Sequence, residues 1–131
     1  KYDMQRNYLK LVLFYILFVF ASHGYASEWY EGGTLHKANA LEWQKASYKN
    51  KLATSADFIA VLYNQGRLTP ELSTQVKNMD DLKLLAEELT KQLDMAFEPF
   101  ADKKKNRKVY QNQSVSNTAV SLMLMMGWIK S

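Results

Sequence analysis

The stretch DDLKLLAEELTKQLDMAF, residues 80–97, carries the clearest structural signal in the chain. Its apolar residues recur at intervals of three and four, the spacing that places side chains on one face of an α-helix. Either Asn78 or Asp80 can begin this helix, and Pro99 stops it because proline has no backbone N–H to continue the hydrogen-bond ladder. The predicted buried stripe consists of Leu82, Leu85, Ala86, Leu89, Leu93, Ala96 and Phe97.

A second helix is predicted on the N-terminal side, from Asn39 to Asn64. Asn39 favours the N-cap position, and Glu42 follows three positions later, as in a capping box. A start at Thr34 is the alternative. Gly66 suits the left-handed residue that commonly follows a helix.

Two further helices complete the prediction. Residues 69–71, Thr-Pro-Glu, open a short helix because threonine caps and proline fits the first helical position. The last helix begins near Ser114 or Ser116 and ends at Gly127, and residues 99–113 are predicted to be a polar connection. No segment alternates as a strand does, so the predicted fold class is all-α, a small bundle of three to four helices.

The N-terminal segment has the three-part pattern of a signal peptide. Met4 is the first methionine and the predicted start, Arg6 and Lys10 form a basic region, and residues 11–21 are an unbroken apolar run. This run is shorter than the roughly 20 residues that cross a bilayer. Small residues at Gly24 and Ala26 fit cleavage after Ala26.

We therefore predict a signal peptide over residues 1–26 and a single helical domain over residues 27–131. The predicted location is outside the cytoplasm, in the periplasm or the extracellular space. The alternative is that residues 8–26 stay on the protein as a membrane anchor. A buried core helix is disfavoured, because residues 11–20 are apolar on every face.

Composition excludes several kinds of chemistry. The chain has no cysteine, which removes disulfides, thiolate metal sites and thiol catalysis. Its two histidines, His23 and His36, are too few for a histidine-rich metal site, so no metal or cofactor is predicted. The net charge of +4 divides equally between residues 1–26 and the remainder, which is too weak to argue for nucleic acid.

No known catalytic motif occurs in the chain. It lacks a G-x-S-x-G elbow, a glycine-rich phosphate loop and an H-E-x-x-H pair. Asp57 is interpreted as an edge residue that pairs with a nearby cation, and His36 as a structural or surface histidine. The neighbours Glu87 and Glu88 point about 100° apart on a helix, so they do not form an acid–base pair. We predict that the protein is not an enzyme.

One candidate site is a basic cluster within the predicted polar connection. In functional terms it would contact a polyanion, such as an anionic membrane surface. The simpler interpretation is a solvated loop between helices. The cluster consists of Lys103, Lys104, Lys105, Arg107 and Lys108.

The other candidate site is the methionine-rich last helix. Its predicted face contains Val115, Ala119, Leu122, Met123 and Met126. Core packing is the first interpretation, and a contact with a second copy or a hydrophobic ligand is the alternative. If the protein has a partner surface, its predicted residues are Met123, Met126 and Trp128, with Trp128 as the anchor. Trp128 and Ile129 are also expected to fold back on the bundle.

A short segment, Thr-Ser-Ala-Asp-Phe-Ile at residues 54–59, resembles the Thr-Cys-x-Asp-Phe-Leu segment of small periplasmic acid-stress chaperones. The resemblance covers six residues of 131, and Ser55 stands where that family has a cysteine that pairs in a disulfide. No residue role or mechanism is carried over. The resemblance implies only that a small periplasmic helical chaperone belongs among the candidate classes.

These observations lead to one main functional hypothesis. The protein is an exported, non-enzymatic helical protein that binds another protein or itself. The first alternative is a peripheral protein that binds an anionic surface through residues 103–108. Two further classes stay open, an enzyme of unfamiliar type and a membrane-anchored accessory subunit that keeps its leader.

Overall fold

The computed structural model describes residues 27–130. The predicted signal peptide over residues 1–26, its cleavage point after Ala26 and the alternative anchor over residues 8–26 lie outside the described residues. The described chain forms, in order, α2 (Ala40–Lys45), α3 (Tyr48–Asn64), α4 (Pro70–Gln75), α5 (Met79–Ala96), α6 (Lys103–Tyr110) and α7 (Val115–Met125).

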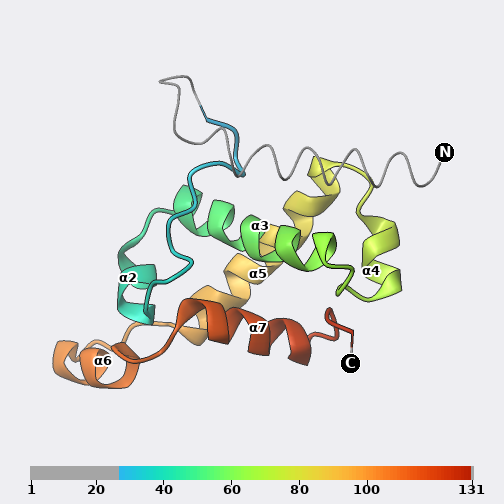
Figure 1. Cartoon of the computed structure of the whole chain (residues 1–131). Coiled ribbons are helices and arrows are strands. Elements are labelled where there is room, and N and C mark those ends of the chain that lie inside the picture. The colour runs from blue at the N-terminus through green and yellow to red at the C-terminus, as the bar shows by residue number, and fades with distance from the viewer. Residues whose placement is uncertain (1–26, 131) are drawn as a thin grey trace.

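Between residues 27 and 130 the backbone contains no strand, only two isolated β-bridges, so the all-α prediction is confirmed. α5 packs against both α3 and α7. In Figure 1, α5 crosses behind α3 and α7, α4 lies at one end of the molecule, and α6 projects from the other end. No helix in this part of the chain is long and apolar enough to cross a membrane.

The six described helices exceed the three to four predicted, for two reasons. The helix predicted from Asn39 to Asn64 is divided in two, because the backbone is extended at Ala46 and Ser47, where the Ser47 hydroxyl caps α3 by accepting from Asn50 N. The prediction of a polar connection over residues 99–113 is also wrong, since α6 forms there.

The central helix, α5, follows its sequence pattern closely. Asn78 is its N-cap, and its side-chain oxygen accepts a hydrogen bond of 2.9 Å from Asp81 N. Leu82, Leu89 and Leu93 are completely buried. Burying a leucine contributes about 1.5–3 kcal/mol, so the stripe is a main source of stability.

A pair of hydroxyl groups lies inside the contact between α3 and α5. The Ser55 and Thr90 oxygens are hydrogen-bonded at 2.9 Å, and the Thr90 hydroxyl also lies 2.8 Å from the Ala86 carbonyl oxygen. Both side chains are completely buried. Because a buried hydroxyl without a partner is costly, the pair fixes how α3 and α5 face each other.

α3 and α7 end in the same way, and their exits pair. A glycine with positive φ follows each helix, at Gly66 and Gly127, and each helix closes with the 6→1 hydrogen bond of a Schellman motif. The chain beyond each glycine forms an antiparallel bridge between Leu68 and Ile129. Both of these residues are buried, so the predicted return of the apolar tail is confirmed at Ile129.

The N-terminal ends of α2 and α7 are joined in a similar way. Their N-cap residues, Asn39 and Ser114, form the other antiparallel bridge. The bridge is held by Ala40 N donating to Gln113 O and by Val115 N donating to Ala38 O. α7 is therefore tied by backbone hydrogen bonds at both of its ends.

The loop before α2 comes very close to α3 at one glycine. A Cβ atom on Gly33 would lie 2.7 Å from Thr54 N and 2.9 Å from the Ala53 carbonyl carbon. Two residues later, Leu35 N donates to the Thr54 hydroxyl at 3.3 Å. A residue without a side chain is therefore required at position 33.

The hydroxyl pair can be tested by a double-mutant cycle. Thr90→Val leaves the Ser55 hydroxyl buried without this partner, so we expect it to lower the free energy of unfolding by about 1–3 kcal/mol. Adding Ser55→Ala removes the hydroxyl that lost its partner. The double variant should therefore lose less free energy of unfolding than the sum of the losses in the two single variants. Urea unfolding measures all four proteins, and strictly additive losses would contradict the proposed coupling.

The close approach at Gly33 gives a second prediction. Gly33→Ala should lower the free energy of unfolding by about 1–3 kcal/mol, because the new methyl group meets backbone atoms that cannot rotate away. Amide exchange at Leu35 should accelerate as the loop lifts from α3. Gly66→Ala is the control: its Cβ meets nothing within 4 Å, so its cost comes from the positive φ and Leu35 exchange should not change. Equal Leu35 exchange in both variants would refute the steric argument.

Candidate functional site

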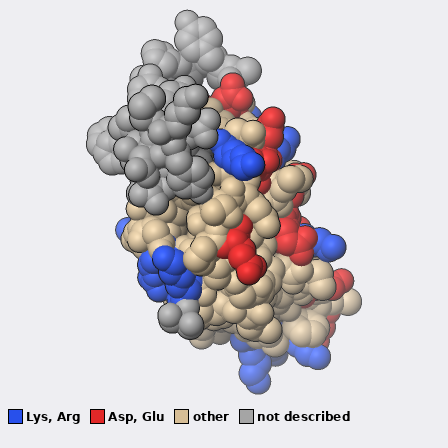
Figure 2. Space-filling model, turned by 90° about the vertical axis from the view of Figure 1, so that its right-hand side faces the viewer, with Lys and Arg blue, Asp and Glu red and all other residues tan. Residues whose placement is uncertain are grey.

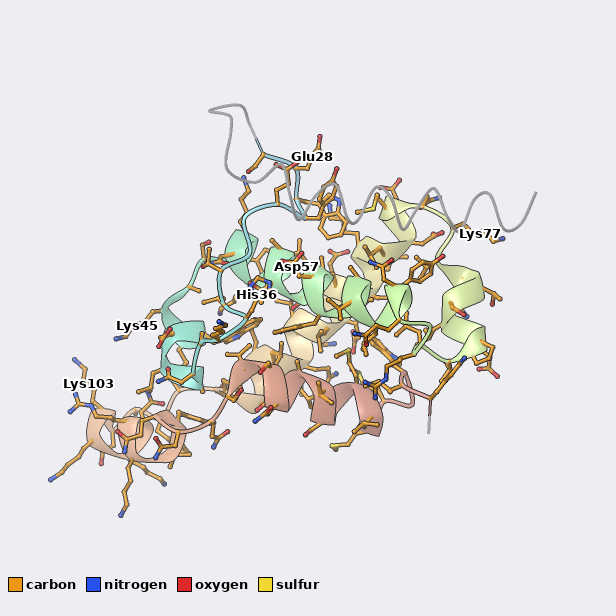
Figure 3. The ribbon with its side chains drawn as sticks, viewed as in Figure 1. Glu28, His36, Lys45, Asp57, Lys77 and Lys103 are labelled. Atoms are coloured by element: carbon orange, nitrogen blue, oxygen red, sulfur yellow. The ribbon has the colours of Figure 1, made fainter. Side chains whose placement is uncertain are left out.

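His36 and Asp57, predicted as separate residues, lie together. The loop before α2 places His36 Nε2 2.7 Å from Asp57 Oδ2 on α3, and the histidine ring meets Phe58 edge-on at 5.7 Å (Figure 3). The prediction that Asp57 pairs with a nearby cationic group thus applies when His36 is protonated. Within residues 27–130, no hydroxyl is hydrogen-bonded to the other ring nitrogen of His36.

An open cleft of about 420 Å³ lies between α2, the start of α3 and the end of α5. The Asp94 carboxylate accepts from the Trp43 indole N–H and from Lys51 Nζ, both at 2.9 Å. Gln44 donates to the Phe97 carbonyl oxygen at 2.8 Å. These polar groups line the cleft and are hydrogen-bonded within the protein.

Two tyrosines have shifted pKa values. Burial raises the pKa of Tyr48, and the carboxylates of Glu87 and Asp94 raise it further. Burial likewise raises the pKa of Tyr30, followed by the effects of Glu28 and Glu31. Both shifts move the phenol further from neutral pH, so neither tyrosine is prepared to act as a general base there. No group of acidic or histidine side chains in the described chain could hold a metal ion.

The predicted basic cluster forms most of α6, an exposed helix. Asp102 caps its N-terminus by accepting from Lys104 N and Lys105 N. All five cations of the cluster, Lys103, Lys104, Lys105, Arg107 and Lys108, are exposed. None of them forms an ion pair with the described residues, where the ion pairs are His36–Asp57 and Lys51–Asp94.

The inner face of α6 is held by an amide pair and a hydroxyl. Asn106 Nδ2 donates to Gln44 Oε1 at 2.8 Å, and Gln44 Nε2 donates back to Asn106 Oδ1 at 3.1 Å. One turn later, the Tyr110 hydroxyl donates to the Glu98 carbonyl oxygen at 2.8 Å. These bonds fix which side of α6 faces the protein.

Aromatic rings continue this attachment. Tyr110 stacks on Phe100 at 5.6 Å and meets Phe97 edge-on at 6.1 Å. Phe97 in turn lies edge-on to Trp43 of α2 at 6.4 Å. The row of rings joins α6 to the core, so the five cations are presented by a fixed helix rather than by a solvated loop.

The methionine-rich helix, α7, faces the core with the residues predicted from its spacing. Met123 is only 1% exposed, and Met126 and Trp128 are partly buried. The Met123 side chain therefore lies in the core rather than on the surface, as the core-packing interpretation has it. Partner binding itself stays a prediction.

The opposite side of α7, which the sequence reasoning did not single out, is the exposed one. Val120 is 43% exposed, Leu124 54% and Met125 82%. The three lie outside the arc that holds Met123, because successive residues turn by about 100°. A helical wheel could have shown this face only after the buried face was known.

Comparison with known proteins adds no assignment to these surfaces. No protein-family model, curated protein or solved structure matches the chain.

Proposed function

We propose that this protein is an exported, non-catalytic binding protein that pairs with a second copy of itself through the outer face of α7. The outer face is defined by Asn117, Val120, Ser121, Leu124 and Met125. The observation that carries the proposal is the exposure of three large apolar side chains on one face of a helix that has no charged residue.

Exposed apolar side chains are common singly, but here two of them are neighbours. Val120 and Leu124 lie one turn apart, and Met125 lies about 100° further round the helix from Leu124, at the edge of the outer face. Covering apolar surface stabilises an interface by about 25 cal/mol for each Å² removed from water. Methionine adapts to irregular partners, which suits an interface that packs against its own copy.

The absence of charge favours a second copy as the partner. Residues 109–129 contain no Asp, Glu, Lys or Arg. In a two-fold dimer each residue near the axis meets its own copy, so a charged face would repel itself. By contrast, the face in Figure 2 shows separate basic and acidic groups on a largely uncharged surface.

The expected pairing is weak and reversible. A standard interface buries about 800 Å² on each partner. α7 has 11 residues and is therefore about 16 Å long, so its outer face supplies only part of that area. We expect a dimer that dissociates on dilution.

The non-catalytic part of the proposal is supported by the polar groups already described. In the cleft beside Trp43, the Asp94 carboxylate and the Gln44 amide are engaged within the protein, and the His36–Asp57 pair has no bonded hydroxyl among residues 27–130. Export is supported by the sequence pattern of residues 1–26.

Sedimentation of the purified protein over a range of concentrations tests the pairing. Leu124→Glu places a charge at the proposed interface and should shift the protein fully to monomer. Leu84→Glu is the matched control, because Leu84 is a 67% exposed leucine on α5. Pairing that persists in Leu124→Glu, or that Leu84→Glu abolishes equally, would contradict the proposal.

The intact mass of the protein tests export. Expressed in a bacterium from Met4 and recovered by fraction, it should have the mass of a chain that starts at Ser27 and should appear in the periplasmic or secreted fraction. Ala26→Arg replaces a small residue at the cleavage point with a large charged one, so the variant should keep its leader. A full-length mass of the unaltered protein in the membrane fraction would favour the anchored accessory subunit instead.

A further inference from the structure

We propose that α6 is a docking element for an anionic lipid surface, with the helix lying along the membrane plane. This function goes beyond the pairing through α7 and does not depend on it. The occupant is a bilayer that contains anionic headgroups, and four features of α6 favour it: its charge, its exposure, its attachment to the core and its apolar edge.

Lys104, Lys105 and Lys108 lie on the side of α6 that faces away from the protein, Arg107 lies at the edge of that side, and Lys103 is exposed at the start of the helix. At about 100° per residue, Asn106 and Tyr110 share the inner side, and Lys104 and Lys108 lie opposite them. Figure 3 shows long side chains spreading outward from this helix, with Lys103 labelled among them. Lys45, at the end of α2, lies on the same side of the molecule (Figure 3).

This charge is not neutralised by the protein. The five cations form no ion pair within residues 27–130. Two carboxylates precede the helix, but the Asp102 side chain is occupied in capping backbone N–H groups, which leaves Glu98 as the nearby exposed acid in the sequence. The five cations of α6 thus outnumber the two acids that directly precede the helix, Glu98 and Asp102, and an excess of positive charge remains there.

The helix dipole does not favour the charge of the first three lysines. Lys103, Lys104 and Lys105 lie in the first turn, where the positive end of the helix dipole repels cations. Acidic or neutral residues there would favour the same helix more. The cationic first turn therefore favours contact with an anionic partner.

Apolar side chains border the cationic face and favour a bilayer. Phe100 is 36% exposed and Val109 37% exposed. Val109 lies one turn after Lys105 on the same side of the helix, and Lys105 Nζ lies 4.5 Å from the centre of the Phe100 ring. Cations beside exposed apolar groups suit the headgroup region, where both find favourable surroundings.

Nucleic acid is the less suitable polyanion. Non-specific binding of single strands uses aromatic side chains on which bases stack. Here the Phe100 ring is engaged by Tyr110 and Lys105, and Tyr110 itself is buried. α6 is also short, about 12 Å for its eight residues, so it would follow only a small part of a nucleic-acid backbone.

The test is sedimentation of the full protein with phosphatidylcholine vesicles, with and without anionic phosphatidylglycerol. We expect binding only to the anionic vesicles, and loss of that binding at high salt. The triple variant Lys104→Gln, Lys105→Gln, Lys108→Gln should bind about a hundredfold more weakly, since each basic residue near the surface contributes about fivefold. All three side chains are exposed, so circular dichroism should show unchanged helix content.

The matched control removes the same charge elsewhere. Lys37, Lys77 and Lys130 are exposed lysines outside α6, and changing all three to glutamine should weaken vesicle binding by less than about threefold. Equal losses in the two triple variants would overturn the proposal, because they would show a response to net charge alone.

Two further outcomes test whether α6 is the binding surface and whether an anionic bilayer is its ligand. The Leu124→Glu variant should still bind anionic vesicles, which distinguishes the cationic surface of α6 from the outer face of α7. Equal binding to vesicles of pure phosphatidylcholine, or binding of a mixed-sequence oligonucleotide without binding to either vesicle, would overturn the lipid assignment.

Discussion

The burial of α5 between α3 and α7 is the constraint that organises this protein. α5 carries an apolar stripe too continuous to remain in water, and the helices that cover it come from opposite sides of it in the sequence. Its alignment with α3 is specified by the Ser55–Thr90 hydroxyl pair, which tolerates only a narrow range of positions. Leucine burial therefore provides most of the attraction, and two small polar groups determine how the helices are aligned.

Local signals in the sequence predicted much of this fold. Asn39, Asn78 and Ser114 cap the helices that they were expected to begin, and Gly66 and Gly127 follow the helices that they were expected to end. These signals act within a few residues, so they can be recognised without knowledge of the tertiary structure. The apolar period of α5 was reliable for the same reason.

The features that were missed depend on distant contacts or lack a period. α6 has one buried residue, Tyr110, so it carries no apolar stripe; its only local signals were the Asp102 cap and a run of good helix formers. His36 and Asp57 are 21 positions apart, and only the path of the loop beside Gly33 brings them together. On α7, the residue types were recognised as a possible contact surface, but the exposed face could be identified only once α5 was placed against Met123.

The two β-bridges at the ends of α7 have a consequence for the order of assembly. Residues 113–115 pair with residues 38–40, and residues 128–130 pair with residues 67–69, so the early part of the chain obtains these backbone partners from its last part. A chain that emerges N-terminus first, from a ribosome or through a translocation channel, cannot close either bridge until α7 has emerged. Closure of the fold is thus coupled to the delivery of α7, because neither bridge can form before its residues are available.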